Sequence, residues 1–477
     1  MKKNKFTKTY KRLAEIPLPH KARPTRDERF CLIVPPSPFV VPNGWEWVHS
    51  APFEGPAIIA TLVRGLGYHF SLIDQRDDFD VKKLKGKLTD FDIVGITTHE
   101  DSFPYIKKAV EIAKKEKSDR PVILGGTLVT SAPNIVMENT LADYAILGEG
   151  ELTTIELLDF ISGDKRAMPI EKIKGIAWRD KNGKIVINES REPLENLDLV
   201  PFQDFSVWQR FEGKDIPEIF LSYSRGCAFD CSFCYRAFPK LRFKSVDRVR
   251  REIEYLAKRN FKMVWWNDLT FTINPEYVHE LLNKAISRHD FHWCCFARAA
   301  NVDLQLLKHM KKHGCNLLLY GFESITDEIL NGYTKRCNKN DILRAIDVTR
   351  KAKLKVGGLL IIGSPEETES SLNNVIKFAR QFKEVTRVKY LSAIPGTRLY
   401  KDLVKKGFIK NELKHLYFLA RERAVEDDEF LRLSKVSEKK LRAAYRAINE
   451  VIEKRPYEYE KEENVFLKKP VKFKKRT

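Results

Sequence analysis

The distribution of apolar residues along the first third of the chain predicts strands and helices in alternation. Short apolar runs with the length and β-branched content of buried strands are separated by amphipathic stretches. Uninterrupted apolar strands that alternate with helices are typical of a parallel sheet covered on both faces. We therefore expect a doubly wound, flavodoxin-like α/β domain over residues 30–165. The predicted strands are 30–34, 70–74, 91–98, 121–129 and 143–151.

A second series of strand–helix units follows. Six units in sequence predict a partial (β/α)6 TIM-like barrel over residues 216–410. The chemistry of such a barrel is expected at the carboxyl ends of its strands. The predicted strands are 218–224, 263–271, 293–299, 316–324, 357–363 and 387–395.

The remaining segments flank these two domains. Residues 166–215 predict a hairpin, with its turn at Asn182 and Gly183, followed by a linker. Residues 1–29 form a basic N-terminal arm, and residues 411–477 form a helical extension with a basic tail. We expect both basic ends to be flexible.

Composition narrows the class of protein. Of the 477 residues, 43% are hydrophobic, and no apolar run approaches the roughly 20 residues of a membrane helix. The basic N-terminus has no apolar centre, which argues against a secretory signal. Eight irregularly spaced cysteines do not indicate a disulfide framework, so we expect a reduced, cytoplasmic setting. The net charge of +20 is compatible with nucleic acid, anionic lipid or an acidic substrate, and equally with a lysine-rich proteome.

Three cysteines follow the first predicted barrel strand. Cys227, Cys231 and Cys234 have the spacing Cys-x3-Cys-x2-Cys within the stretch LSYSRGCAFDCSFCYRAF. Four thiolates would close a zinc site or saturate an iron–sulfur cube, whereas three leave one corner open. The alternative is a structural zinc completed by a distant ligand. The residues that could complete it are His292, Cys294, Cys295 and Cys315.

The cysteine motif resembles that of the radical S-adenosylmethionine (SAM) enzymes, and the resemblance extends over the barrel half. It implies that Cys227, Cys231 and Cys234 are catalytic and hold a [4Fe-4S] cluster. It also implies that SAM chelates the fourth iron and is reductively cleaved to a 5′-deoxyadenosyl radical.

Segments at the other predicted strand ends resemble the SAM-binding motifs of the same family. One departure lies in IIGSPEET, where Ser-Pro-Glu stands in place of the common Leu-Pro-Gly. Glu323 has an alternative as the cap of a helix beginning near Thr326, and Tyr235 has an alternative as a packing residue. The implied SAM contacts are Tyr235, Asn267, Asp268, Arg298, Glu323, Gly363 and Glu366.

The N-terminal half resembles the cobalamin-binding domains that precede many radical SAM enzymes. Glycines at strand ends let a backbone approach a flat ligand, although they are also ordinary turn residues. The motif Asp-x-His-x2-Gly, which supplies a lower cobalt ligand in many cobalamin proteins, does not occur here. The implied cobalamin contacts are Gly95, Thr97, Thr98, Gly125, Gly126, Thr127, Gly148 and Glu149.

These resemblances imply a cobalamin-dependent radical SAM enzyme that methylates an unactivated carbon. Alternatives are ring formation or rearrangement without methylation, a methylthiotransferase, and a non-catalytic iron–sulfur protein. A methylthiotransferase would carry three further cluster cysteines in the N-terminal domain, where only Cys31 occurs. The implied partners are a small-molecule, lipid or peptide substrate and a reductant such as flavodoxin or ferredoxin. Nucleic acid is not favoured, and a peripheral membrane contact is compatible with the basic charge.

Overall fold

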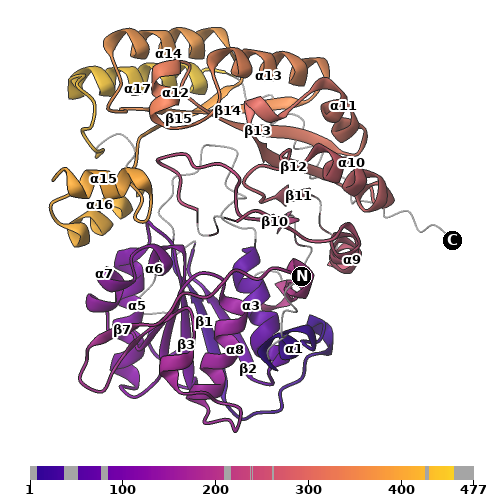
Figure 1. The fold of residues 1–477 in the computed structure, drawn as a ribbon, viewed down its shortest axis with the longest axis vertical. Coiled ribbons are helices and arrows are strands. Elements are labelled where there is room, and N and C mark those ends of the chain that lie inside the picture. The colour runs from indigo at the N-terminus through magenta and orange to yellow at the C-terminus, as the bar shows by residue number, and fades with distance from the viewer. Residues whose placement is uncertain are drawn as a thin grey trace. The chain divides into compact units, whose positions relative to one another are not determined.

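A computed structural model of the chain divides into two compact units (Figure 1). The first contains residues 1–39, 52–214 and 404–424, and the second contains residues 40–51, 215–403 and 425–477. The end of the predicted linker and the predicted basic tail lie outside the described residues. The structure describes residues 8–36, 52–76, 84–208, 216, 218–236, 238, 240–259, 261, 263–424 and 429–455.

A seven-stranded sheet with the order β2-β1-β3-β4-β5-β6-β7 forms the centre of the first unit. Neighbouring strands from β2 to β5 are parallel, which confirms the predicted flavodoxin-like sheet. The strands are β1 (Arg29–Val34), β2 (His69–Asp74), β3 (Ile93–Thr98), β4 (Val122–Gly126), β5 (Tyr144–Ile146), β6 (Ile176–Arg179) and β7 (Ile185–Ile187).

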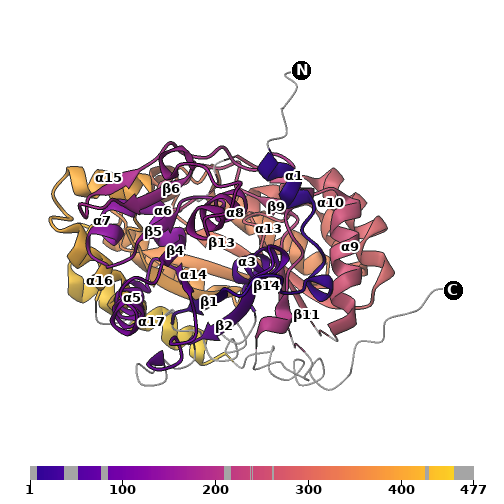
Figure 2. The same cartoon turned by 90° about the horizontal axis from the view of Figure 1, so that it is seen from below.

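Helices cover both faces of this sheet because successive side chains of each strand point to opposite sides. Helix α5 lies on one face of the sheet, and helices α3 and α8 lie on the other (Figure 2). Cys31 and Ile33 of β1 pack with Phe103 of α5, whereas α3 and α8 form a second core with Leu13. The helices of the unit are α1 (Lys8–Ala14), α3 (Glu54–Gly65), α5 (Phe103–Glu116), α6 (Thr127–Ser131), α7 (Pro133–Glu138), α8 (Gly150–Ile161) and α16 (Glu412–Ala424).

The predicted hairpin extends the sheet. Strand β6 pairs antiparallel with β5 and with β7, so the sheet becomes mixed at this edge. The turn carries Gly183 with a φ of 80°, a left-handed conformation that glycine adopts without a steric penalty. Part of the segment that was expected to be a linker therefore belongs to the first unit.

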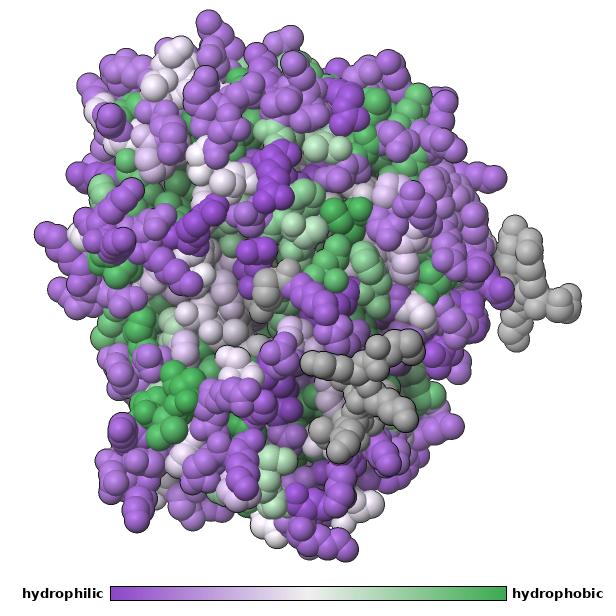
Figure 3. All heavy atoms as spheres, viewed as in Figure 1, coloured by the Kyte–Doolittle hydropathy of each residue, from purple (hydrophilic) through white to green (hydrophobic). Residues whose placement is uncertain are grey.

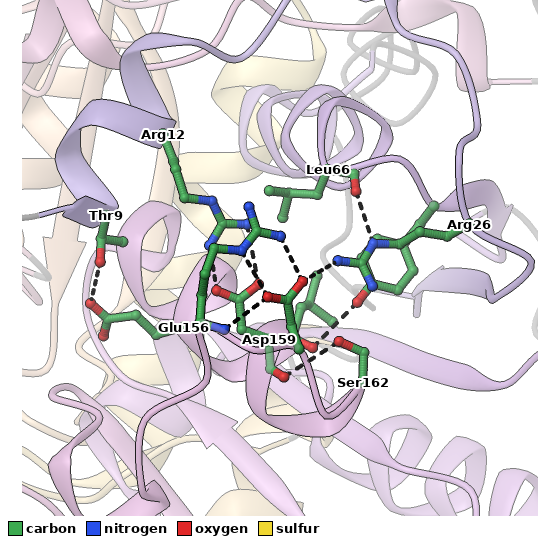
Figure 4. Close-up of polar contacts among 11 residues, drawn as sticks. Thr9, Arg12, Arg26, Leu66, Glu156, Asp159 and Ser162 are labelled. Atoms are coloured by element: carbon green, nitrogen blue, oxygen red, sulfur yellow. Dashed lines mark hydrogen bonds and ion pairs between the residues drawn. The ribbon is translucent and has the colours of Figure 1, made fainter.

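The described part of the basic arm packs on helix α8 (Figure 4). Arg12 forms an ion pair with Asp159, and the Thr9 hydroxyl donates to Glu156 Oε1 at 2.9 Å. Arg26 donates from Nη2 to Asp164 Oδ2 at 2.9 Å. The expectation of a flexible arm is wrong for these residues, because Arg12 and Arg26 form ion pairs with acidic side chains of the same unit.

The second unit contains a six-stranded sheet with the order β15-β14-β13-β12-β11-β8. Every neighbouring pair is parallel, as expected for a partial barrel. The strands are β8 (Glu218–Leu221), β11 (Met263–Trp266), β12 (His292–Ala297), β13 (Cys315–Glu323), β14 (Lys355–Ile362) and β15 (Val385–Tyr390).

Side-chain caps begin the helices that follow these strands. Asn274 accepts from the Tyr277 amide at the start of α10, and Asp303 accepts from the Leu306 amide at the start of α11. Each cap satisfies a backbone donor that has no partner within the helix. The α-helices of the unit are α9 (Val246–Leu256), α10 (Pro275–Lys284), α11 (Leu304–Lys312), α12 (Asp327–Gly332), α13 (Lys339–Lys351), α14 (Glu369–Gln381), most of α15 (Arg398–Lys405) and α17 (Glu438–Glu453).

The C-terminal helices join different units. Tyr417 of α16 packs edge-on against Phe103, with ring centroids 5.3 Å apart. Tyr445 of α17 stacks on Tyr390 of β15, with ring centroids 4.7 Å apart.

Polar side chains dominate the face drawn in Figure 3. Within the described ranges, no helix has the length and apolar character needed to span a bilayer.

Candidate active site

The cysteine loop is closed at its base by two short strands. Strand β9 (Ser224–Arg225) pairs antiparallel with β10 (Arg242–Phe243). Gly226 follows β9 with a φ of 91°, and a Cβ there would lie 2.3 Å from the Lys240 carbonyl oxygen. Only glycine fits this close approach of two backbone segments. The loop that begins here carries the three cysteines, all of them half-buried.

Asp268 fixes the backbone that enters this loop. Its carboxylate is almost fully buried at the end of β11 and accepts from the Ser224 amide at 2.7 Å and the Tyr223 amide at 3.1 Å. Sequence reasoning placed Asp268 at SAM, and that role stays a prediction. Asn267 is exposed beside it, and its backbone amide donates to the Leu221 carbonyl.

Arg298 reaches the cysteine loop from the end of β12. Its Nη1 lies 3.5 Å from Cys231 Sγ, and its guanidinium lies 3.7 Å from the centroid of the Phe229 ring. Nη2 donates to the Lys335 carbonyl oxygen. Arg298 is 6% exposed, so it brings a buried positive charge to the loop. The structure thus brings together a predicted cluster ligand and a predicted SAM contact.

Glu323 ends strand β13 with a φ of 59°, a left-handed conformation that non-glycine residues rarely adopt. Its Oε1 accepts from Lys335 Nζ at 2.7 Å. Sequence reasoning missed Lys335, because no periodic pattern indicates that a lysine in a connecting loop will be buried. Tyr235 lies half-buried next to Cys234.

The environment of Cys234 disfavours a free thiolate that has no cationic partner. The pKa of Cys234 is raised to about 11, mainly because the thiol is buried and in addition because Cys231, Cys227 and Glu323 lie nearby. A thiolate that is buried beside other negative groups needs cationic partners. The three-cysteine loop therefore fits an iron–sulfur cluster.

Three of the residues that could complete a zinc site, Cys294, Cys295 and Cys315, are buried in strands β12 and β13. Within the described ranges, no three Cys, His, Asp or Glu side chains are grouped so that they could hold one metal ion. Cys294 and Cys295 are buried in β12, and burial followed by the Cys315 hydrogen bond raises the pKa of Cys295.

Gly363 follows β14 with a φ of 88°, and its amide donates to Glu367 Oε2 at 3.2 Å. Glu367 is buried and was missed by sequence reasoning, which chose its exposed neighbour Glu366. A Cβ on Gly332 would lie about 3 Å from the Glu366 carboxylate oxygens, so this side chain lies against the backbone after α12. The choice between two adjacent glutamates depends on which one turns inward.

The carboxyl edge of β3 and β4 in the first unit is a second candidate site. Thr97 and Gly125 are register partners there. Thr97 Oγ1 is buried and has no hydrogen-bond partner among the described residues. Within the same part of the chain, no heavy atom lies within 4 Å of a Cβ built on Gly125 or Gly148. An unpaired polar atom beside open backbone fits a flat ligand such as cobalamin.

Other predicted cobalamin contacts serve the packing of this unit. A Cβ on Gly95 would lie 2.8 Å from the Phe30 ring, and one on Gly126 would lie 2.5 Å from the Thr98 carbonyl oxygen. Thr98 is fully buried, and its hydroxyl accepts from the Val129 amide. The glycine and threonine pattern alone does not separate these packing roles from ligand contacts.

The two remaining predicted contacts lie at the starts of helices. The Thr127 hydroxyl donates to the Thr98 carbonyl oxygen at 3.3 Å. Glu149 precedes α8, and its Oε2 accepts from the Leu194 amide at 2.6 Å. Thr130, which sequence reasoning missed, accepts from the Gly148 amide at 3.0 Å and thereby fixes this loop.

Comparison with known proteins agrees with both sites. Residues 221–379 match the radical SAM superfamily, and residues 55–158 match the B12 binding domain. An uncharacterized methyltransferase of Pyrococcus horikoshii is 29% identical over 72% of this chain and 79% of its own length.

Solved structures share the fold. The radical SAM methyltransferase TsrM from Kitasatospora setae has a TM-score of 0.65 and 19% identity, over 80% of this chain and 76% of that one. The cobalamin-dependent radical SAM enzyme OxsB has a TM-score of 0.63 and 14% identity, over 82% of this chain and 56% of that one.

The three-cysteine loop and the matched barrel define a radical SAM enzyme, and the first unit is a B12-binding domain. The chain therefore combines the two domains of a cobalamin-dependent radical SAM enzyme, and an uncharacterized methyltransferase is among its relatives. Its cofactors are accordingly a [4Fe-4S] cluster, SAM and cobalamin.

Proposed function

We propose that this enzyme methylates an unactivated carbon of its substrate. The observation that carries the proposal is a three-cysteine loop held against Arg298 in a chain that also contains a B12-binding domain. When bound, the cluster and SAM supply a radical that removes hydrogen from the substrate carbon, and cobalamin supplies the methyl group.

The chain's own residues hold and orient these groups. Cys227, Cys231 and Cys234 bind three irons, and Arg298 offsets part of the negative charge at Cys231. Glu323 orients SAM from the end of β13, while the buried Glu367 holds the Gly363 backbone where adenine is expected to bind. Tyr235, Asn267, Asp268 and Glu366 complete the proposed SAM contacts.

Thr97 and the open backbone at Gly125 and Gly148 receive cobalamin at the carboxyl edge of the first sheet. Gly95, Thr98, Gly126 and Thr127 keep that edge in shape through the packing described above. Glu149 does the same for the loop before α8.

The enzyme needs a reductant and acts on a small substrate. We propose flavodoxin or ferredoxin as the reductant, and a small molecule, lipid or peptide as the class of substrate. A cytoplasmic location stays a prediction.

Anaerobic reconstitution tests the proposed function. The wild-type chain is loaded with iron, sulfide and cobalamin, and is then given SAM with a methyl label and a low-potential reductant. We expect both 5′-deoxyadenosine and S-adenosylhomocysteine as products, together with methylcobalamin that carries the label. Formation of 5′-deoxyadenosine without S-adenosylhomocysteine or labelled methylcobalamin would contradict methyl transfer and leave only radical generation.

A further inference from the structure

A short connecting segment braces the cysteine loop. Residues 333–336, called the brace below, follow α12. The Tyr333 carbonyl accepts from the Ser232 amide at 2.9 Å, and the Thr334 hydroxyl donates to the Asp230 carbonyl at 3.0 Å. The rings of Tyr333 and Phe233 meet edge-on at 4.9 Å. The brace therefore contacts the cysteine loop between Asp230 and Phe233, on both sides of its second cysteine.

The backbone of the brace is unusual on both sides of Lys335. Thr334 has a φ of 50° and Arg336 a φ of 48°, both in the left-handed region. Non-glycine residues remain there only where surrounding contacts hold them. The Lys335 amide donates to the Leu330 carbonyl at 2.9 Å, and its carbonyl accepts from Arg298. The position of Lys335 is thus fixed by its backbone.

The Lys335 side chain points into the site. The residue is 5% exposed, and Nζ lies 2.7 Å from Glu323 Oε1. A Cβ on Gly321 would lie 2.2 Å from Glu323 Oε1 and 3.0 Å from Lys335 Nζ, so the pair lies across the bare backbone of β13. The same Arg298 side chain that donates to the Lys335 carbonyl lies 3.5 Å from Cys231 Sγ, which links this pair to the cysteine loop.

We propose that Lys335 is a positioning residue that orients Glu323 and, with Arg298, supplies the buried positive charge that sets the reduction potential of the cluster. The inference rests on the cluster of the proposed function and not on methyl transfer. A reduced cluster carries one more negative charge than an oxidised one. A buried cation beside it therefore favours reduction more than an exposed cation does, because water screens the exposed charge.

The midpoint potential of the reconstituted cluster, followed by electron paramagnetic resonance without SAM or substrate, tests this role. We expect Lys335→Met to keep its iron and to move the potential to a more negative value. Lys335→Arg should restore the wild-type potential. Glu323→Gln should move the potential the other way, and the double variant should return close to wild type.

Arg336→Met is the matched control. It removes the same charge from the neighbouring position of the brace, but the Arg336 side chain is 62% exposed where it pairs with Asp230. Its shift should be much smaller than that of Lys335→Met. Equal shifts in the two variants, or no shift in Lys335→Met, would overturn the proposal.

If Lys335→Met does not retain iron, the midpoint potential of the Glu323→Gln variant becomes the test of the proposal. An unchanged potential in that variant would overturn the proposal, and a less negative one would support it. The measurement needs no methyl acceptor, so methyl transfer can fail while the role of Lys335 holds. A wild-type chain that binds no iron would instead refute the cluster itself.

Discussion

The two candidate sites are built in opposite ways. In the second unit, the cysteine loop is surrounded by buried charged side chains, Arg298, Lys335 and Asp268, each tied to backbone or to a counter-charge. In the first unit, the edge of β3 and β4 is marked by open backbone instead. Gly125 leaves open space there, and Thr97 offers one unpaired hydroxyl.

The difference follows from what each site must bind. A cluster held by three thiolates brings negative charge into a partly buried loop, so its site needs cations with fixed positions. A large flat ligand is bound mainly through shape, so its site needs backbone that carries no side chains. Substitutions should therefore damage the second unit through charge and ligation, and the first unit through added volume.

The largest effect is expected at the cluster ligands. Cys231→Ala should abolish stable binding of the [4Fe-4S] cluster, because two thiolates cannot hold it against exchange. Iron and sulfide content per chain, with the optical spectrum of the reconstituted protein, measures the loss.

Cys295→Ala is the matched control for that loss. Cys295 is fully buried in β12, and its thiol is part of the core. The variant should bind iron as the wild-type chain does. Equal losses in the two variants would show that the cysteine triplet is not the ligand set.

The next effect concerns the open edge of the first unit. Gly125→Val should fold normally and lose at least about 10-fold in cobalamin affinity, a cost of about 1.4 kcal/mol. The valine side chain would occupy the space beside Thr97 that the ligand needs. Equilibrium binding of hydroxocobalamin to the purified chain measures the change.

Gly126→Ala sharpens the contrast at the next position. Gly126 has a φ of 123°, and a Cβ would collide with the Thr98 carbonyl oxygen at 2.5 Å. This variant should lose stability, whereas Gly125→Val should not. If Gly125→Val also lowers the melting temperature by as much, the open edge is a packing feature and not a ligand site.

The same contrast explains how much could be predicted from the sequence. The positions of the strands, the cysteine loop that follows β8 and the place of Arg298 at the end of β12 could be predicted, because periodicity and short motifs are local properties. The packing roles of Gly95 and Gly126 could not, since they depend on which strand lies alongside. Lys335 was missed because its burial depends on a left-handed turn between residues that are not glycine.

The third prediction concerns the buried carboxylate of Asp268 in the second unit. Asp268→Ala leaves the amides of Tyr223 and Ser224 without their acceptor, and should cost about 3 kcal/mol of unfolding free energy. Iron content should fall with it, since these residues lead into the cysteine loop. Asn267→Ala, at the exposed neighbouring position, is the control and should change neither quantity. Equal stability of both variants would contradict the structural role of Asp268.

The smallest effect is a pH dependence that arises from Glu367. Burial is the main cause that raises the pKa of Glu367 above its ordinary value. A carboxyl group whose pKa is higher in the folded state contributes stability at low pH, and this contribution is lost as the pH rises through the folded-state pKa. Glu367→Gln keeps an acceptor for the Gly363 amide but cannot ionise. Its stability relative to wild type should therefore increase from about pH 4, where an unfolded glutamate titrates, towards neutral pH.

Urea unfolding of both proteins at pH 4 and pH 8 measures this difference, and Glu366→Gln at the exposed neighbour is the matched control. Parallel pH profiles for wild type and Glu367→Gln would show that folding does not raise the pKa of Glu367 and would contradict this prediction. A relative stability of Glu367→Gln that falls as the pH rises would instead show that the carboxylate is stabilised in its charged form.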